Sequence, residues 1–361
     1  MGIFPGFFGR NKSGARENRF GLTPEAHLAA QREKTRVRDD AVPEPRGSSL
    51  VQPKALPPGT KVLGLRVDVD THEGMRDGVP KLLEVLRSAE VKGTFYFAMG
   101  PDRSGLAIFN VFTRPGFLSK MLRSGAPKVY STRTMLSGTL LPSRPVATAF
   151  PEIARRVDAE GHETGVHAWD HRRWQDSLLR FSEDKVVLEL ERGFDAYVSI
   201  FSKKPLTYAA PAWFCCEESL LHQEKMSLAY ASDCRGMDPF YPVIDGHALR
   251  TPQVPATLPT LDEALGLSHK TAPAFYGAML EAVKAGEWPV LTIHAELEGG
   301  PFAADFAAFL AKAKEQGILV LPLRDLLAAR LAAGAPLPRC TMAYGQIEGR
   351  HGLVSLQMLE V

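Results

Sequence analysis

The sequence has few cysteines and no long apolar run. Its four cysteines include the adjacent pair Cys215 and Cys216, which cannot easily bridge to each other, and none of the four forms a Cys-x-x-Cys motif. The spacing therefore argues against a cysteine metal cluster or redox motif and favours reduced thiols in a cytoplasmic setting. No run of about 18 apolar residues occurs, so a membrane-spanning helix is not expected.

Net charge is also small, and it is unevenly distributed. The 361 residues carry a formal charge of +2, which argues against broad nucleic-acid binding. Residues 1–60 hold ten lysines and arginines against six acidic residues, so the remainder is slightly acidic. The first ten residues are apolar but too short for a secretory core and lack a basic start, so no signal peptide is expected. They are either an aromatic surface anchor or part of a disordered leader.

Composition divides the chain into three parts. Residues 11–60 are rich in Arg, Glu, Pro, Gly and Ser, which is typical of a solvated linker, so 1–60 are expected to form no packed core. Residues 61–335 are expected to form one α/β domain, and 336–361 a C-terminal extension. The oligomeric state is not determined by any of these features.

From residue 61 onward, predicted strands and helices alternate. Such a βα repeat indicates a parallel sheet, although periodicity alone does not decide whether the sheet closes into a barrel. The expected strands are 62–71, 91–99, 163–167, 206–210, 228–232, 288–294 and 318–322. The expected helices are 79–88, 146–160, 184–201, 217–226, 273–285, 303–316 and 324–333.

One insert, residues 101–145, interrupts this alternation. It interleaves Phe109, Phe112 and Phe117 with basic residues such as Arg114. Aromatic and basic side chains together suit a membrane surface with anionic headgroups, or a polyprenyl phosphate lying in it. The alternative is a helix pair that caps the barrel with its phenylalanines buried.

Two carboxylates end the first predicted strand. Asp68 and Asp70 are spaced i, i+2, so both side chains would share one face at the end of that strand. Two like charges so close are costly unless a positive partner lies beside them, and a divalent metal is the simplest such partner. The alternative is that both are ordinary strand-end or capping carboxylates.

Two histidines about a hundred residues later complete a possible metal site. His167 and His171 are spaced i, i+4, which predicts that both imidazoles lie on one helical face and chelate a single ion. Asp70 with these histidines is a reasonable three-ligand set for a zinc-like ion with an open position for water. Cobalt, nickel and manganese suit the same ligands.

These motifs resemble the metal-dependent polysaccharide deacetylase (NodB-homology, carbohydrate esterase family 4) family. The resemblance covers about residues 62–333, and the first sixty residues find no counterpart. It implies a distorted, incomplete, TIM-like (β/α) barrel with its site at the C-terminal ends of the strands. The segments that carry it are 64–71, 77–80, 165–171, 232–236 and 292–296.

The resemblance also implies roles for individual residues. Asp68 would accept a proton from the attacking water, and His294 would protonate the departing amine. Asp233 would orient His294 and keep its pKa high. The family often carries an arginine that positions the catalytic aspartate, but residues 209–214 contain no basic residue. Either Arg235 substitutes for it or the aspartate has no such partner.

Three further residues lie near these motifs, and two of them keep open alternatives. Glu296 and Glu298 are either substrate contacts or solvated loop acids, and Glu296 fits the matched segment better. His162 is off register with the proposed ligand face and is interpreted as structural.

The activity implied by the resemblance is metal-dependent hydrolysis of an N-acyl group, first of all N-formyl, from an amino sugar linked to undecaprenyl phosphate. In the family, this step belongs to aminoarabinose modification of lipid A, which confers resistance to cationic peptides such as polymyxin. It would place the protein peripherally at the cytoplasmic face of the inner membrane, against an anionic surface. The alternatives are an N-acetyl deacetylase of a peptidoglycan or chitin-like glycan, and a sugar-binding homologue without catalysis.

Overall fold

A parallel sheet built around strand β1 (Lys61–Val69) forms the centre of the computed structural model, which describes residues 51–106, 137–139, 142–350 and 352–360. Every residue of β1 after Lys61 is buried, which explains its continuous apolar run. β1 pairs in parallel with β2 (Thr94–Phe97), with β10 (Val290–His294) and, through its first half, with β11 (Ile318–Leu321).

The sheet continues beyond β2 and curls into an incomplete barrel. β2 is followed by β5 (Glu163–Val166), β6 (Thr207–Tyr208) and β7 (Tyr230–Ala231). Irregular chain closes the gap between β7 and β10: the Val254 amide donates to Ala231 O over 2.7 Å, and the Leu258 amide to Val290 O over 3.1 Å. The predicted distorted (β/α) barrel is therefore confirmed.

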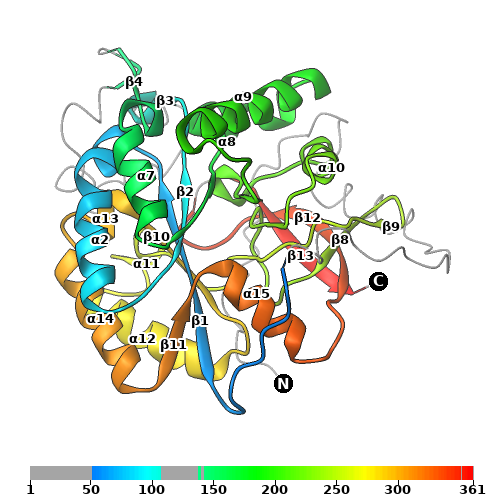
Figure 1. Ribbon diagram of the computed structural model, residues 1–361. Coiled ribbons are helices and arrows are strands. Elements are labelled where there is room, and N and C mark those ends of the chain that lie inside the picture. The colour runs from blue at the N-terminus through cyan, green and yellow to red at the C-terminus, as the bar shows by residue number, and fades with distance from the viewer. Residues whose placement is uncertain (1–50, 107–136, 140–141, 351, 361) are drawn as a thin grey trace.

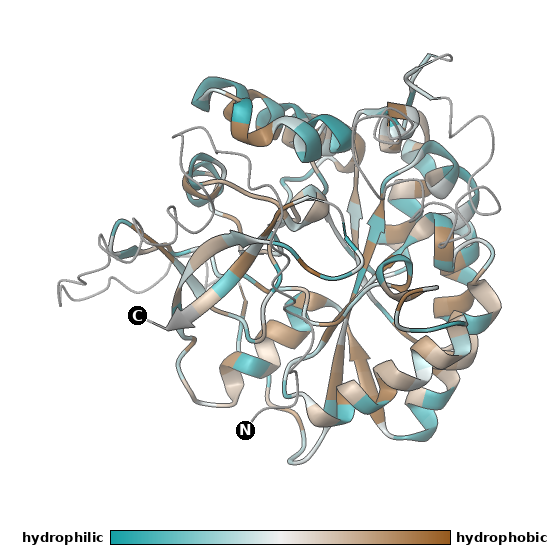
Figure 2. Cartoon of the chain, turned by 180° about the vertical axis from the view of Figure 1, so that it is seen from behind, coloured by the Kyte–Doolittle hydropathy of each residue, from teal (hydrophilic) through white to brown (hydrophobic). Residues whose placement is uncertain are grey.

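Helices cover the outside of this sheet, and Figure 1 shows α2, α7, α12 and α14 together on one side of β1. Apolar residues are concentrated on the central strands, whereas the helices carry polar segments (Figure 2). The predicted helices agree with the structure to within one residue at each end, except that the helix expected at 146–160 begins only at Pro151, after a 3-10 turn. The long helices are α2 (Val79–Ser88), α7 (Pro151–Ala159), α9 (Glu183–Phe201), α10 (Glu217–Lys225), α12 (Ala272–Ala285), α14 (Ala303–Glu315) and α15 (Leu323–Ala332).

Short elements occupy the connections. Strands β3 (Pro101–Asp102) and β4 (Arg144–Pro145) pair at the two ends of the insert. The short helices are α8 (His171–Ser177), α11 (Leu261–Ala264) and α13 (Ala295–Glu298).

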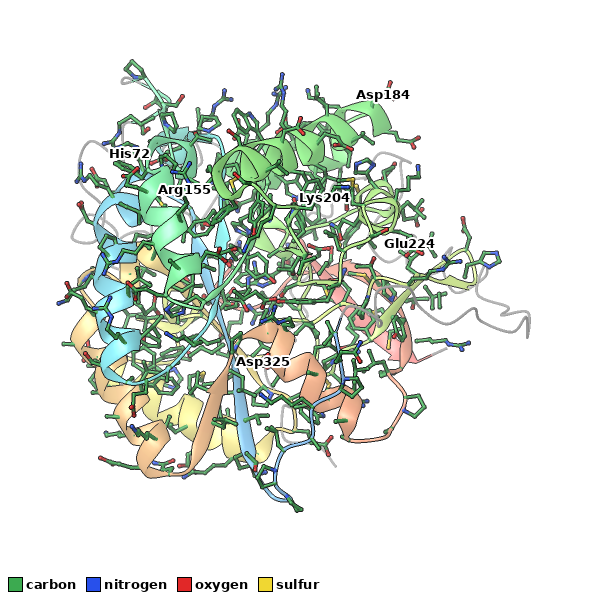
Figure 3. All side chains as sticks on the ribbon, in the orientation of Figure 1. His72, Arg155, Asp184, Lys204, Glu224 and Asp325 are labelled. Carbon is green, nitrogen blue, oxygen red and sulfur yellow. The ribbon has the colours of Figure 1, made fainter. Side chains whose placement is uncertain are left out.

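Helices α7 and α9 pack against each other beside the sheet. Arg155 of α7, labelled in Figure 3, donates from Nε to the carbonyl of Ile200 near the end of α9 over 2.8 Å. The Phe201 ring lies 6.0 Å from that of Phe97 on β2. These contacts fix the layer of helices over β2 and β5.

A second, smaller sheet lies outside all predicted strands. Its order is β13 (Val354–Glu360), β12 (Arg339–Gly345), β8 (Tyr241–Ile244) and β9 (His247–Ala248). It joins the barrel where the Arg235 amide donates to Ser355 O over 2.9 Å and the Gln357 amide to Arg235 O over 2.8 Å. β13 therefore runs beside the segment that follows β7.

Several sequence predictions fall on residues outside the described ranges. These are the leader up to residue 50 and the membrane-docking prediction for Phe109, Phe112 and Phe117. In the described part of the chain, no helix combines the length and apolar character needed to cross a bilayer. All four cysteines are described, and each is a buried thiol without a disulfide.

Candidate metal centre and catalytic site

Asp68 lies near the end of strand β1, and Asp70 follows the strand directly. Asp68 is only 3% exposed. Arg66, two residues earlier on the same strand, donates to it from Nε to Oδ1 and from Nη2 to Oδ2, each over 2.7 Å. Burial alone raises the pKa of Asp68, but the charges of Arg66 and His167 outweigh burial and bring that pKa to about 2. Asp68 is therefore an ionised carboxylate held in a fixed orientation.

The guanidinium of Arg66 is fully buried and has all its nitrogen atoms engaged. Its Nη1 donates to the carbonyl and to the hydroxyl of Ser232. Its Cζ lies 5.3 Å from the centroid of the Tyr96 ring and 5.5 Å from that of the Trp213 ring. Such a fork between two aromatic rings can hold a carboxylate at two points.

Arg66 resolves the question left by the missing arginine in residues 209–214. Arg235, the substitute considered from the sequence, instead forms an ion pair with Glu263 at 3.2 Å. Arg66 was missed although one signal was present: alternate residues of a strand share a face, so an arginine at i−2 lies beside Asp68.

His167 follows β5 directly and is completely buried. Its Nδ1 lies 2.7 Å from the carbonyl oxygen of Ala209. Because a carbonyl only accepts, Nδ1 carries the proton and Nε2 presents a lone pair. That Nε2 lies 3.3 Å from Asp70 Oδ1. The backbone carbonyl thus selects the tautomer that a metal ligand requires.

His171 is the first residue of α8, and the prediction that it shares a helical face with His167 is wrong. Ala168 adopts a left-handed conformation with φ of 62°, so the chain turns between the two histidines, and Asp170 caps α8 by accepting from the Arg173 amide over 3.0 Å. The two imidazole rings nevertheless meet, with centroids 5.1 Å apart. The turn, and not helical spacing, brings them together.

The ligand atoms of Asp70, His167 and His171 all lie within 4.8 Å of one another. Burial lowers the pKa of His167 to about 4 and that of His171 to about 3, so both imidazoles are neutral at pH 7. Asp70 Oδ1 and His167 Nε2 are buried and have no hydrogen-bond partner among the described residues. Two acceptors facing each other at 3.3 Å repel unless a cation lies between them, so the residues fit a divalent metal ion.

His294 ends β10, in register with Asp68 on the neighbouring strand β1. Its Nδ1 lies 3.7 Å from Asp262 Oδ1, a residue of α11. Burial lowers the pKa of His294, but Asp262, Asp70 and other carboxylates raise it to about 9. The imidazole is therefore protonated at neutral pH and able to donate.

The structure corrects the predicted partner of His294, because Asp233 is oriented elsewhere. Asp233 accepts from the Ala210 amide over 2.7 Å and from Gln253 Nε2 over 3.1 Å. Burial raises its pKa to about 6. The carboxylate at His294 is that of Asp262, which the sequence analysis missed because no matched motif contains it.

The two glutamates that follow His294 have different surroundings. Glu298 accepts from the His294 amide over 2.9 Å and from the Tyr276 hydroxyl over 3.1 Å, so it braces the end of β10. Glu296 Oε2 is buried without a hydrogen-bond partner in the described ranges. Neither glutamate is a solvated loop acid. The interpretation of His162 as structural agrees with its contact, because its Nδ1 accepts from the Gly93 amide over 3.2 Å.

Comparison with known proteins identifies relatives of this chain. A family model described as polysaccharide deacetylase matches residues 56–231. A 4-deoxy-4-formamido-L-arabinose-phosphoundecaprenol deformylase (ArnD) from Shewanella sediminis is 36% identical over 299 residues, 82% of this chain and 95% of the relative. A protein of the same name from Wigglesworthia glossinidia brevipalpis is 30% identical over 286 residues, 79% of this chain and 98% of the relative.

One solved structure supports the architecture. A polysaccharide deacetylase from Mycobacterium smegmatis superimposes with a TM-score of 0.54 and covers 82% of this chain and 98% of its own. Its sequence is 20% identical, so this likeness concerns the fold alone.

Proposed function

The chain belongs to the polysaccharide deacetylase family, and from this premise we propose that it hydrolyses the N-formyl group of a 4-amino sugar carried on undecaprenyl phosphate. The family and its relatives make it a hydrolase of amide carbon–nitrogen bonds. The formyl group and the lipid carrier are proposed because the names of the two relatives described above contain formamido, deformylase and phosphoundecaprenol.

The observation that carries the proposal is the combination of three groups at the carboxyl ends of the strands. Asp70, His167 and His171 bring their ligand atoms within 4.8 Å of one another, Asp68 is an ionised carboxylate, and His294 is a protonated imidazole. Amide hydrolysis needs a base for water and an acid for nitrogen, and here both are present beside a cation site.

Asp70, His167 and His171 would hold one divalent ion, which we propose to be zinc, with cobalt, nickel or manganese as replacements. When bound, such an ion supplies Lewis-acid polarisation of the amide carbonyl. The two histidine ligands need no change of protonation, because both imidazoles are already neutral at pH 7.

Asp68 would accept one proton from the water whose oxygen attacks the formyl carbon. Its two bonds to Arg66 keep the carboxylate in one orientation for that transfer. His294 would then give a proton to the sugar nitrogen as the carbon–nitrogen bond breaks. The products are formate and a free amine, and each proton has a named donor and acceptor.

The cellular setting follows from the proposed substrate. An undecaprenyl-linked sugar stays in the bilayer, so the enzyme would work peripherally at the cytoplasmic face of the inner membrane. The product would serve aminoarabinose modification of lipid A, which reduces negative surface charge and protects against cationic peptides such as polymyxin.

The test compares acyl groups on one carrier. Zinc-reconstituted protein is incubated with formylated and acetylated forms of the same lipid-linked amino sugar, and free amine is followed over time. We expect faster release from the formylated substrate, no release by Asp68→Asn, and unchanged release by the surface control Asp158→Asn. Preference for the acetylated substrate would favour a glycan-type deacetylase, and no release from either would favour a non-catalytic homologue.

A further inference from the structure

Arg350 lies in the loop between β12 and β13, beside Glu263 of α11 and the ring of Trp213. Gly349 has a φ of 80°, and a Cβ there would clash with the carbonyl oxygen of Glu263, so the loop approaches α11 more closely than another residue type allows. The Arg350 side chain is 12% exposed, and its Nη1 lies 3.5 Å from Glu263 Oε1. The position of Arg350 is thus fixed by the backbone on one side and by a carboxylate on the other.

Three arginines surround the indole of Trp213. The Cζ atoms of Arg235 and Arg350 each lie 4.6 Å from its ring centroid, and that of Arg66 lies 5.5 Å away. Arg66 in turn holds Asp68, the candidate base. Only the Trp213 ring and the Arg66 guanidinium therefore lie between Arg350 and Asp68.

The three guanidinium groups have only two carboxylates between them. Arg66 is paired with Asp68. Glu263 accepts from Arg235 over 3.2 Å and from the backbone amide of Thr260 over 3.0 Å. Arg350 must share Glu263 with Arg235, and its guanidinium donates no hydrogen bond to any residue that the structure describes. One positive charge with unused donors therefore remains beside the Trp213 ring.

We propose that Arg350 binds the phosphate that links the sugar to its lipid, so that the site selects a phosphate ester over a neutral glycan; this rests on the proposed function. A phosphodiester is a monoanion whose oxygens match the planar donor fork of arginine. On the proposed substrate the phosphate at the anomeric carbon and the formamide at C4 occupy opposite ends of one sugar ring. In this proposal Arg350 takes the phosphate while the formamide lies at the metal ligands.

The first arm of the test measures kinetics on two substrates that differ only in the phosphate. One is the N-formyl amino sugar as a short-chain prenyl phosphodiester, and the other is its methyl glycoside. We expect Arg350→Gln to raise KM for the phosphodiester about 10- to 100-fold, as for loss of a charge-assisted hydrogen bond, with kcat nearly unchanged. KM for the methyl glycoside should not change, and Arg350→Lys should restore part of the loss.

Arg330→Gln is the matched control. Arg330 is also a buried arginine, paired with Asp238 by two bonds of 2.9 Å, but it lies on α15 and contacts no site residue. It should lower stability without separating the two substrates. If Arg350→Gln raised KM for both substrates equally, or for neither, Arg350 would only stabilise the C-terminal hairpin, and the proposal would be overturned.

A second arm does not depend on hydrolysis. Binding of farnesyl phosphate and of inorganic phosphate to the zinc-loaded protein is measured by calorimetry. We expect farnesyl phosphate to bind more tightly than inorganic phosphate, and Arg350→Gln to weaken farnesyl phosphate at least tenfold. Equal binding of the two phosphates, or unchanged binding by the variant, would refute the lipid-phosphate assignment. If the wild type bound farnesyl phosphate through Arg350 but released no formate, the proposed activity would fail while this subsite stood.

Discussion

Arg66 and Asp68, two residues apart on β1, form a two-point ion pair inside the barrel, with both hydrogen bonds at 2.7 Å. The arginine is fully buried and the aspartate nearly so. A buried pair of this kind stabilises the fold little by itself, but removal of one partner leaves the other charge uncompensated, at a cost of about 3–5 kcal/mol. We infer that its value lies in orienting the carboxylate.

Acid stability should depend on Asp68. Its pKa in the folded protein is about 2, below the ordinary 3.8, so ionised Asp68 stabilises the fold above pH 3.8 and that contribution is lost as the pH falls toward 2. The loss should be on the order of 2 kcal/mol. Urea unfolding of metal-free protein across this window should show a smaller drop in Asp68→Asn than in wild type and in Asp158→Asn. Parallel curves for wild type and Asp68→Asn would contradict the assignment.

The basic limb of the rate profile should belong to His294 and be set by Asp262. The pKa of His294 is about 9, because nearby carboxylates outweigh burial. The acid form that donates to nitrogen is therefore lost only above about pH 9, and Asp262→Asn should move this limb to lower pH. Profiles of kcat/KM against pH measure the shift.

Asp233→Asn separates the two candidate partners of His294. Asp233 accepts hydrogen bonds from Ala210 and Gln253, so its substitution should lower stability and leave the basic limb of the rate profile at the same pH. A limb that moved with Asp233→Asn and not with Asp262→Asn would restore the assignment made from the sequence.

Two glycines should respond in opposite ways to alanine. A Cβ at Gly78 would clash with the carbonyl oxygen of Ala295, the residue after His294, so Gly78→Ala should destabilise the fold and reduce turnover together. Gly277 in α12 has no atom within 4 Å of such a Cβ, so Gly277→Ala should raise the free energy of unfolding by about 1 kcal/mol with turnover unchanged. Thermal unfolding and amine release check both; a stabilising Gly78→Ala would mean that this contact can relax.

The local part of this fold could be predicted from the sequence. Helices such as α9 and α14 begin and end within a residue of their predicted bounds, because their apolar period is a property of the segment itself. The gathering of Asp68, Asp70 and His294 followed from parallel strands, whose carboxyl ends meet at one edge.

The long-range part could not be predicted. Asp262 lies on a one-turn helix and meets His294 only through the tertiary fold. β12 pairs with β8, although about a hundred residues separate the two strands in the sequence. The apolar periodicity of a segment does not indicate such a long-range pairing. The left-handed turn at Ala168 was also hidden, since alanine ordinarily favours a right-handed helix and the i, i+4 spacing then suggested one.

The most direct test of the whole site is the zinc content of the protein. Wild type, His167→Ala and His162→Ala are each equilibrated with zinc, dialysed and analysed by mass spectrometry of the metal. His162 is a buried histidine outside the ligand set and serves as the matched control. We predict one zinc per chain in wild type and in His162→Ala, and nearly none in His167→Ala. Full zinc content in His167→Ala would contradict the metal centre of Asp70, His167 and His171 on which the account depends.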